Sequence, residues 1–113
     1  DLVKDVETLK KLGFAITLHD KMPDVVFYDE EKNWLFFVEA VTSVGPMDPK
    51  RIVELGDLTK KVKAGKIFVT AFLDFATYKR FAADLAWDTE VWIAEMPEHM
   101  IHLNGDRFLG PRG

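Results

Sequence analysis

Two acidic residues have the type and spacing needed for metal-dependent chemistry. Asp24 follows Pro23, and fourteen residues separate it from Glu39. Glu39 is the only charged residue in a run that otherwise contains Trp, Leu, Phe, Val and Ala. A buried acid is rare unless it is paired or bound to a metal. Carboxylate oxygens suit Mg²⁺, which takes one or two of them together with waters and substrate phosphate.

A β-hairpin is expected to position these two acids. Its strands are predicted over Asp24 to Asp29 and Trp34 to Val41, with a charged loop between them. A loop centred between residues 31 and 32 places Asp29 opposite Trp34, and therefore Asp24 opposite Glu39. Facing residues of an antiparallel pair have Cβ atoms roughly 4.5–5.5 Å apart. The sequence thus predicts two carboxylates side by side on one face of a sheet.

Facing acids destabilise a hairpin unless something compensates their charge. A shared proton, a neighbouring Lys or Arg, or a divalent cation would serve. A purely structural interpretation also stands, in which Asp24 starts a strand or closes a turn. In that interpretation Glu39 is paired with Lys50 or Arg51, since buried ion pairs also occur without a function.

The remaining segments predict one α/β domain over residues 1–113. Gly13 and Gly65 stand where helices would end, and Asp48-Pro49 and Asp74 where helices would begin. The expected elements are a helix over Leu2–Leu12, a strand over Phe14–Leu18, the hairpin, a helix from Pro49 to about Val62, a strand over Lys66–Phe72, a helix after Asp74, and strands over Glu90–Glu95 and His99–Leu103. This α-β-β-β-α-β-α-β-β order predicts a mixed central sheet flanked by helices on both faces.

Composition limits the class of protein. The 113 residues are 48% hydrophobic and contain no cysteine, which excludes disulfides and thiolate metal sites and suits a cytoplasmic protein. No apolar run has the roughly 18 to 20 residues of a membrane helix. The net charge of −4 argues against nucleic-acid binding by bulk electrostatics, but not against a local basic patch. The chain begins with Asp1, so we expect it to be a fragment of a longer protein.

Pro23-Asp24 followed by Glu39 on consecutive strands resembles the PD-(D/E)xK nuclease fold. The longer stretch PDVVFYDEEKNWLFFVEAVTSVGPMDPKRIVEL resembles the catalytic domain of the BsuBI/PstI family of type II restriction endonucleases. The later runs KAGKIFVTAF, LAWDTEVWIAE and HMIHLNGDRFLGP are similar to that family too. The resemblance covers nearly everything from Met22 onward.

The resemblance implies Mg²⁺-dependent hydrolysis of DNA phosphodiester bonds by a restriction–modification enzyme. Members of the family cut double-stranded DNA within the palindrome CTGCAG, and they carry an additional N-terminal DNA-binding region, which we expect to be missing from this fragment. A cutter of palindromes is expected to act as a symmetric homodimer.

The sequence departs from the nuclease motif at Val41, where the general motif has a lysine. Some relatives of this fold supply the missing group from the next helix, where Lys50 and Arg51 are the natural substitutes. Ser43 is a smaller alternative, suited to bonding a phosphate oxygen. We therefore expect DNA contacts from Ser43, Lys50 and Arg51.

The predicted mechanism has Asp24, Glu39 and the backbone carbonyl of Ala40 binding Mg²⁺. The ion would polarise a phosphoryl oxygen and activate a water for in-line attack. Lys50 would orient that water or stabilise the developing charge. Glu7 is a weaker candidate for the same site.

Two further interpretations stay open. A non-catalytic DNA-binding or interaction domain on a nuclease-like scaffold would fit Val41 and the acidic net charge. A different nuclease of the same fold, such as a resolvase or a repair enzyme, would fit the acids but not the later family-like runs. A zinc site at His99 and His102 is disfavoured, because residues three apart in a strand face opposite ways. The lysines that follow the Pro49 helix (Lys60, Lys61, Lys63 and Lys66) are interpreted as favourably placed at a helix C-terminus, with phosphate contact as the alternative.

Overall fold

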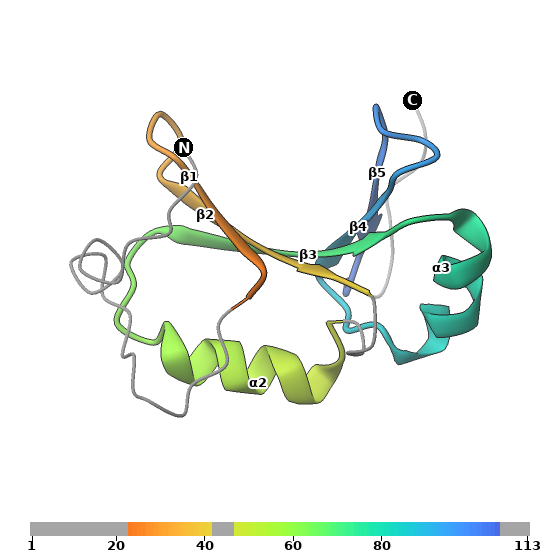
Figure 1. Cartoon of the computed structure of the whole chain (residues 1–113). Helices are drawn as coiled ribbons and strands as arrows, with labels where there is room; N and C mark the ends of the chain where they lie inside the picture. The colour runs from red at the N-terminus through yellow and green to blue at the C-terminus, as the bar shows by residue number, and fades with distance from the viewer. Residues whose placement is uncertain (1–22, 42–46, 107–113) are drawn as a thin grey trace.

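The computed structural model describes residues 23–41 and 47–106, which form a five-stranded sheet with helices beside it (Figure 1). The elements are β1 (Val25–Asp29), β2 (Trp34–Ala40), α2 (Pro49–Leu58), β3 (Gly65–Phe72), α3 (Phe75–Phe81), a single 3₁₀ turn η1 (Ala82–Asp84), β4 (Thr89–Ile93) and β5 (Met100–Leu103). The helix predicted over residues 2–12, the strand over 14–18 and the loop containing Ser43 lie outside the described residues.

The sheet is mixed, as predicted, with the strand order β1-β2-β3-β4-β5. The two hairpins, β1-β2 and β4-β5, are antiparallel, whereas β2-β3 and β3-β4 are parallel. Each parallel pair is joined by a helical crossover, α2 for the first and α3 with η1 for the second. The predicted α/β class is confirmed.

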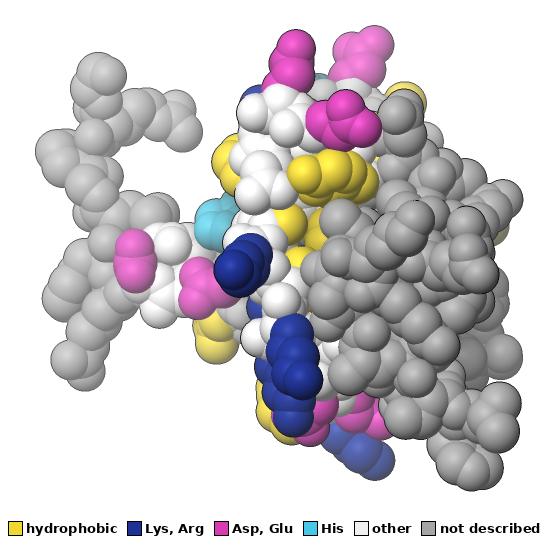
Figure 2. All heavy atoms as spheres, turned by 90° about the vertical axis from the view of Figure 1, so that its left-hand side faces the viewer, with side chains coloured by type: hydrophobic (Ala, Val, Ile, Leu, Met, Phe, Trp, Pro, Cys, Tyr) yellow, Lys and Arg dark blue, Asp and Glu magenta, His cyan; other side chains and the backbone are white. Residues whose placement is uncertain are grey.

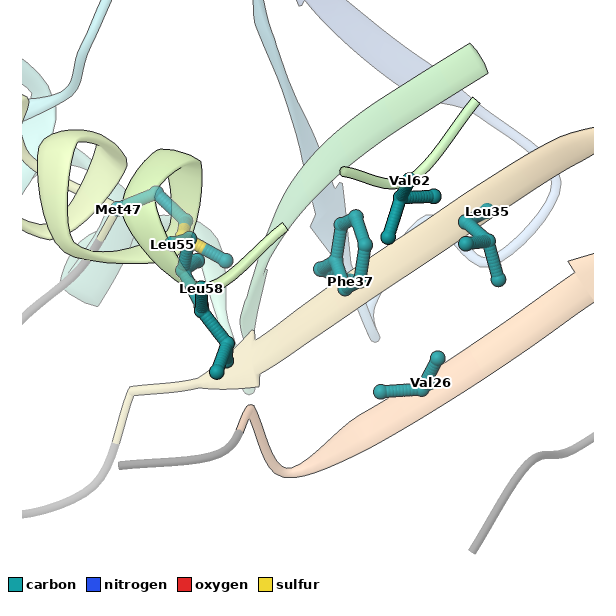
Figure 3. Packing of buried hydrophobic residues seen from close by; sticks show 7 residues of the cluster. All are labelled: Val26, Leu35, Phe37, Met47, Leu55, Leu58 and Val62. Atoms are coloured by element: carbon teal, nitrogen blue, oxygen red, sulfur yellow. The ribbon is translucent and has the colours of Figure 1, made fainter. Parts of the chain in front are cut away.

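The main core lies between α2 and one face of β1, β2 and β3. Side chains at alternate strand positions point to this face, and Leu55 and Leu58 of α2 meet them (Figure 3). Phe37 is fully buried and stacks on Phe68 of β3 with ring centroids 5.3 Å apart. The buried members of the cluster are Val26, Leu35, Phe37, Met47, Leu55, Leu58 and Val62.

A second core lies under α3 on the same face of the sheet. Phe72 is its centre and contacts Tyr78 and Phe81, with ring centroids 5.6 and 6.5 Å away. Val91 and Ile93 of β4 complete the buried floor. Both described helices therefore cover one face (Figure 1), so within the described residues the prediction of helices on both faces is not confirmed.

The first described helix, α2, is shorter than predicted. The predicted helix to Val62 ends at Leu58, because Thr59 leaves helical geometry and its hydroxyl donates to the Leu55 carbonyl at 2.6 Å. Val62 is nevertheless buried in the core, which explains why the apolar spacing ran on past the helix end.

The second face of the sheet carries an apolar groove. Phe27, Phe36 and Val38 form one side of it, and Val69, Ala71, Trp92 and Met100 form the other. In the described parts of the chain, no helix has the length and apolar character needed to cross a membrane.

Candidate active site

The register of the first hairpin is the one predicted. Asp29 faces Trp34, and the pairing continues without a break to Val25 opposite Val38. Asp24 directly precedes β1, so the same register extended by one residue brings it to the level of Glu39. The four-residue turn that sets this register closes at Asn33, which has a φ of 56°. The extended register therefore puts the two acids at the same level, where β1 begins and β2 ends.

Asp24 is exposed and is held by the backbone of β2. Its Oδ2 accepts a hydrogen bond from the Ala40 N–H at 2.8 Å. The N–H and C=O of one residue in an antiparallel strand point to the same side, so the Ala40 carbonyl also faces the Asp24 side of β2. Two of the predicted metal ligands, the Asp24 carboxylate and the Ala40 carbonyl, therefore lie at one point of the sheet.

Glu39 is buried, with 7% of its surface exposed, on the face covered by the helices. Its Oε1 accepts two hydrogen bonds from the Arg51 guanidinium, one from Nε at 2.8 Å and one from Nη2. Within the described residues, Oε2 takes no hydrogen bond. The structure thus contains the ion pair between Glu39 and Arg51, which the sequence analysis gave as one way, besides a metal, to compensate the charge of Glu39.

The cap of α2 positions Arg51. Asp48 accepts the Arg51 N–H at 2.7 Å, and Pro49 fills the first helical position, where a missing N–H costs nothing. Nη1 of Arg51 lies 4.0 Å from Glu54, one turn further along. Backbone and side chain of Arg51 are therefore both held before any ligand is present.

Lys50 and Arg51 are cations in the first turn of a helix that has no acid there. Cations at a helix N-terminus are disfavoured by about 0.3–1 kcal/mol each, so their placement calls for an anion nearby. Arg51 meets Glu39, whereas Lys50 is exposed and forms no ion pair within the described residues. Helical spacing distinguishes them, because Arg51 lies four residues before the buried Leu55 and shares its face. That signal was available in the sequence.

Val41 does not provide a basic group to the site. It lies directly after β2, donates its N–H to the Ala71 carbonyl at 3.0 Å and packs against the second core. Thr70, opposite Glu39 on β3, is fully buried, and its hydroxyl accepts the Met47 N–H at 3.1 Å. The neighbours of Glu39 on the β3 side of the sheet are therefore apolar or neutral.

The donor set suits a hard cation. The described residues contain no cluster of three or more His, Cys, Asp or Glu side chains that would hold a metal alone. Two carboxylates and a carbonyl do match Mg²⁺, which keeps several waters and borrows phosphate oxygens from its substrate. Asp24, Glu39 and Ala40 therefore fit a site that is completed by substrate.

The lysines after α2 lie away from this site. Lys60, Lys61 and Lys63 follow the helix, and Lys66 pairs with Leu35 near the start of β2, the end opposite Ala40. Figure 2 shows several Lys and Arg side chains on this side of the molecule, with acidic side chains above, beside and below them. These lysines therefore do not lie beside Asp24 and Glu39.

The fold is that of a restriction endonuclease. The solved structure of the SdaI restriction endonuclease matches with a TM-score of 0.80 and 44% sequence identity, over 90% of this chain and 32% of that one. The family model for the BsuBI/PstI restriction endonuclease domain matches residues 2–106, and the chain belongs to this family.

Two curated relatives carry the same relationship. The chain is 50% identical over 107 residues to the type II restriction enzyme BsuBI of Bacillus subtilis, and the aligned region covers 95% of this chain and 34% of the relative. It is 38% identical over 91 residues to the type II restriction enzyme AplI of Arthrospira platensis, and the aligned region covers 80% of this chain and 28% of the relative. The chain thus spans about a third of the length of the relatives it matches.

Proposed function

We propose that this chain is the catalytic part of a Mg²⁺-dependent type II restriction endonuclease that hydrolyses phosphodiester bonds of double-stranded DNA. The observation that carries the proposal is the hydrogen bond from the Ala40 N–H to Asp24, directly after the buried Glu39 at the end of β2. Family membership supports the reaction class, and the resemblance to the family supports CTGCAG as the site and a cytoplasmic restriction–modification system as the setting.

The chain's own residues then divide the work. Asp24, Glu39 and the Ala40 carbonyl hold the cation, which when bound supplies Lewis-acid stabilisation of phosphate charge and a more acidic water. The exposed Lys50 orients the attacking water or stabilises charge on the phosphate. Arg51 and Ser43 contact the DNA backbone. A palindromic site calls for two copies of the protein related by a two-fold axis.

Cleavage of a plasmid with a single CTGCAG site tests the proposal. The protein in its natural length is expected to linearise the plasmid at that site with Mg²⁺ and to leave it intact with EDTA. Glu39→Ala should lower the rate by more than about 100-fold, since even residues that only support metal ligands cost 10- to 100-fold. Glu31→Ala, an exposed acid in the turn of the same hairpin, is the matched control. Undiminished cleavage by Glu39→Ala would refute the assignment.

A non-catalytic DNA-binding domain on the same scaffold is the second candidate. The ion pair between Arg51 and Glu39 favours it, because a neutralised Glu39 needs no metal to be stable. Calorimetric titration with Mg²⁺ or Mn²⁺ separates the two candidates. Binding by the wild type that is lost in Glu39→Ala supports the nuclease, and absence of binding even with DNA present supports the scaffold.

A further inference from the structure

A pocket lies between the start of α2 and the segment that follows α3, and we call it the α2–η1 pocket (Figure 1). Its volume is about 640 Å³, within the roughly 300–1,000 Å³ usual for pockets that bind small ligands. Lys50 directly follows one of the lining residues, so the pocket adjoins the residue proposed to assist cleavage. The side chains that matter for its chemistry are Asp48, Pro49, Phe81, Asp84 and Trp87.

Trp87 is a large aromatic side chain that the fold holds out to solvent. It is 71% exposed, although the residues on both sides of it are fixed. The Ala86 N–H donates to the Met47 carbonyl at 2.9 Å, and the Asp88 carboxylate accepts the Gly105 N–H at 2.8 Å. Because burial of an aromatic ring is strongly favourable, an indole left exposed on an anchored loop indicates a ligand with a flat face.

The charged groups of the pocket are arranged with acids inside and cations beside it. Asp84 is exposed on η1, and its carboxylate takes no hydrogen bond from the described residues. The guanidinium of Arg80 lies over the Phe81 ring, 5.5 Å from its centroid, and Lys50 stands at the opposite side of the pocket, after Pro49. A fitting ligand therefore has a flat ring with N–H donors and is joined to an anionic group.

We propose that the α2–η1 pocket receives one base of the DNA substrate, turned out of the duplex, that carries an exocyclic amino group. This inference rests on the proposed nuclease function and deepens it. Trp87 stacks on the base, and Asp84 accepts a hydrogen bond from its amino group, as a carboxylate does from N4 of cytosine. Arg80 and Lys50 contact the phosphates on either side of the extruded nucleotide. Stacking and hydrogen bonds to the base edge are the means by which enzymes bind extruded bases.

A basic side chain from the rest of the protein is the other occupant that an acid beside an indole would suit. The cations that flank the pocket disfavour it, because Arg80 and Lys50 would repel a third positive charge. The same two cations favour a nucleotide, whose phosphates are negative.

Equilibrium binding in EDTA tests the base site without cleavage, in the protein of natural length. The probes are CTGCAG duplexes in which one nucleotide of the site at a time faces an abasic position. At the extruded position the wild type should bind at least about tenfold more tightly than to the fully paired duplex, because a base without a partner costs less to extrude. Trp87→Ala should lose at least about fivefold of its affinity for that duplex, through the lost stacking. Trp87→Phe, which keeps an aromatic face, should stay within about threefold of the wild type.

Leu73→Ala is the matched control, because Leu73 is also a large apolar residue, 76% exposed, and does not line the pocket. It should bind every duplex as the wild type does. Equal binding of all the abasic duplexes by the wild type, together with cleavage in Mg²⁺, overturns the base site and leaves the nuclease intact. A wild type that neither binds nor cuts the DNA overturns both. A lower melting temperature of Trp87→Ala without DNA, with the preference among duplexes unchanged, also overturns the base site and assigns the pocket to a basic side chain of the protein itself.

Discussion

Replacing the Glu39–Arg51 pair by apolar residues tests whether the pair serves function rather than stability. The perturbation is the double variant Glu39→Leu/Arg51→Met, compared with its two single variants. Both side chains are about nine-tenths buried, so solvent screens their interaction little. Removing one partner leaves a buried charge uncompensated, which costs about 3–5 kcal/mol.

The magnitudes follow from that burial. Each single variant should lose about 3 kcal/mol of unfolding free energy, a large share of the 5–15 kcal/mol typical of a domain. The double variant should come within about 1 kcal/mol of the wild type or exceed it, because apolar side chains of similar volume avoid desolvating two charges. The coupling energy between the two sites should therefore be well above 1 kcal/mol.

The assay is urea denaturation in EDTA, followed by circular dichroism and tryptophan fluorescence, with plasmid cleavage measured in parallel. A double variant that is stable and inactive would show that the pair is kept for its chemistry. A double variant less stable than both single variants would refute the reasoning and make the pair a structural element.

Three further outcomes are expected. Asp24→Ala should lower cleavage by more than about 100-fold while its melting temperature stays close to the wild type, because Asp24 is exposed. Phe37→Ala should cost about 3–5 kcal/mol in urea denaturation, whereas Val53→Ala, at a site 64% exposed, should stay within about 0.5 kcal/mol. Hydrogen bonds from Thr77 lower the pKa of Asp74 below its ordinary value. Asp74→Ala should therefore lower the melting temperature at neutral pH, by a margin that shrinks as the pH falls through the folded-state pKa of Asp74. A margin independent of pH would refute the capping role.

Sequence reasoning succeeded where local rules suffice. The symmetry of the loop between β1 and β2 fixed the register that opposes Asp29 and Trp34, because a one-residue slip would turn every apolar side chain to the wrong face. Asp48 and Asp74 were both found as helix caps, because their carboxylates accept backbone N–H groups three residues on. These features depend on neighbours in sequence.

Sequence reasoning was less certain where the outcome depends on packing between distant segments. It favoured Lys50 over Arg51 as the catalytic helper, and that role stays a prediction. It left open which of the two contacts Glu39, although the four-residue spacing between Arg51 and the buried Leu55 pointed to Arg51. It also extended α2 to Val62, because Val62 is buried although the helix has already ended at Leu58. The spacing of apolar residues shows which side chains are buried, and here the buried positions continue beyond the end of the helix.

The hairpin that brings the acids together has a consequence for the order of folding. Its strands are adjacent in sequence, and hairpins form within about 1–10 μs. Arg51 reaches Glu39 only after the α2 crossover has docked, a slower event that must close a longer loop. During that interval Asp24 and Glu39 face each other without a counter-charge. The chain is therefore expected to fold faster at moderate ionic strength than in very dilute buffer, a dependence that should vanish in the apolar double variant.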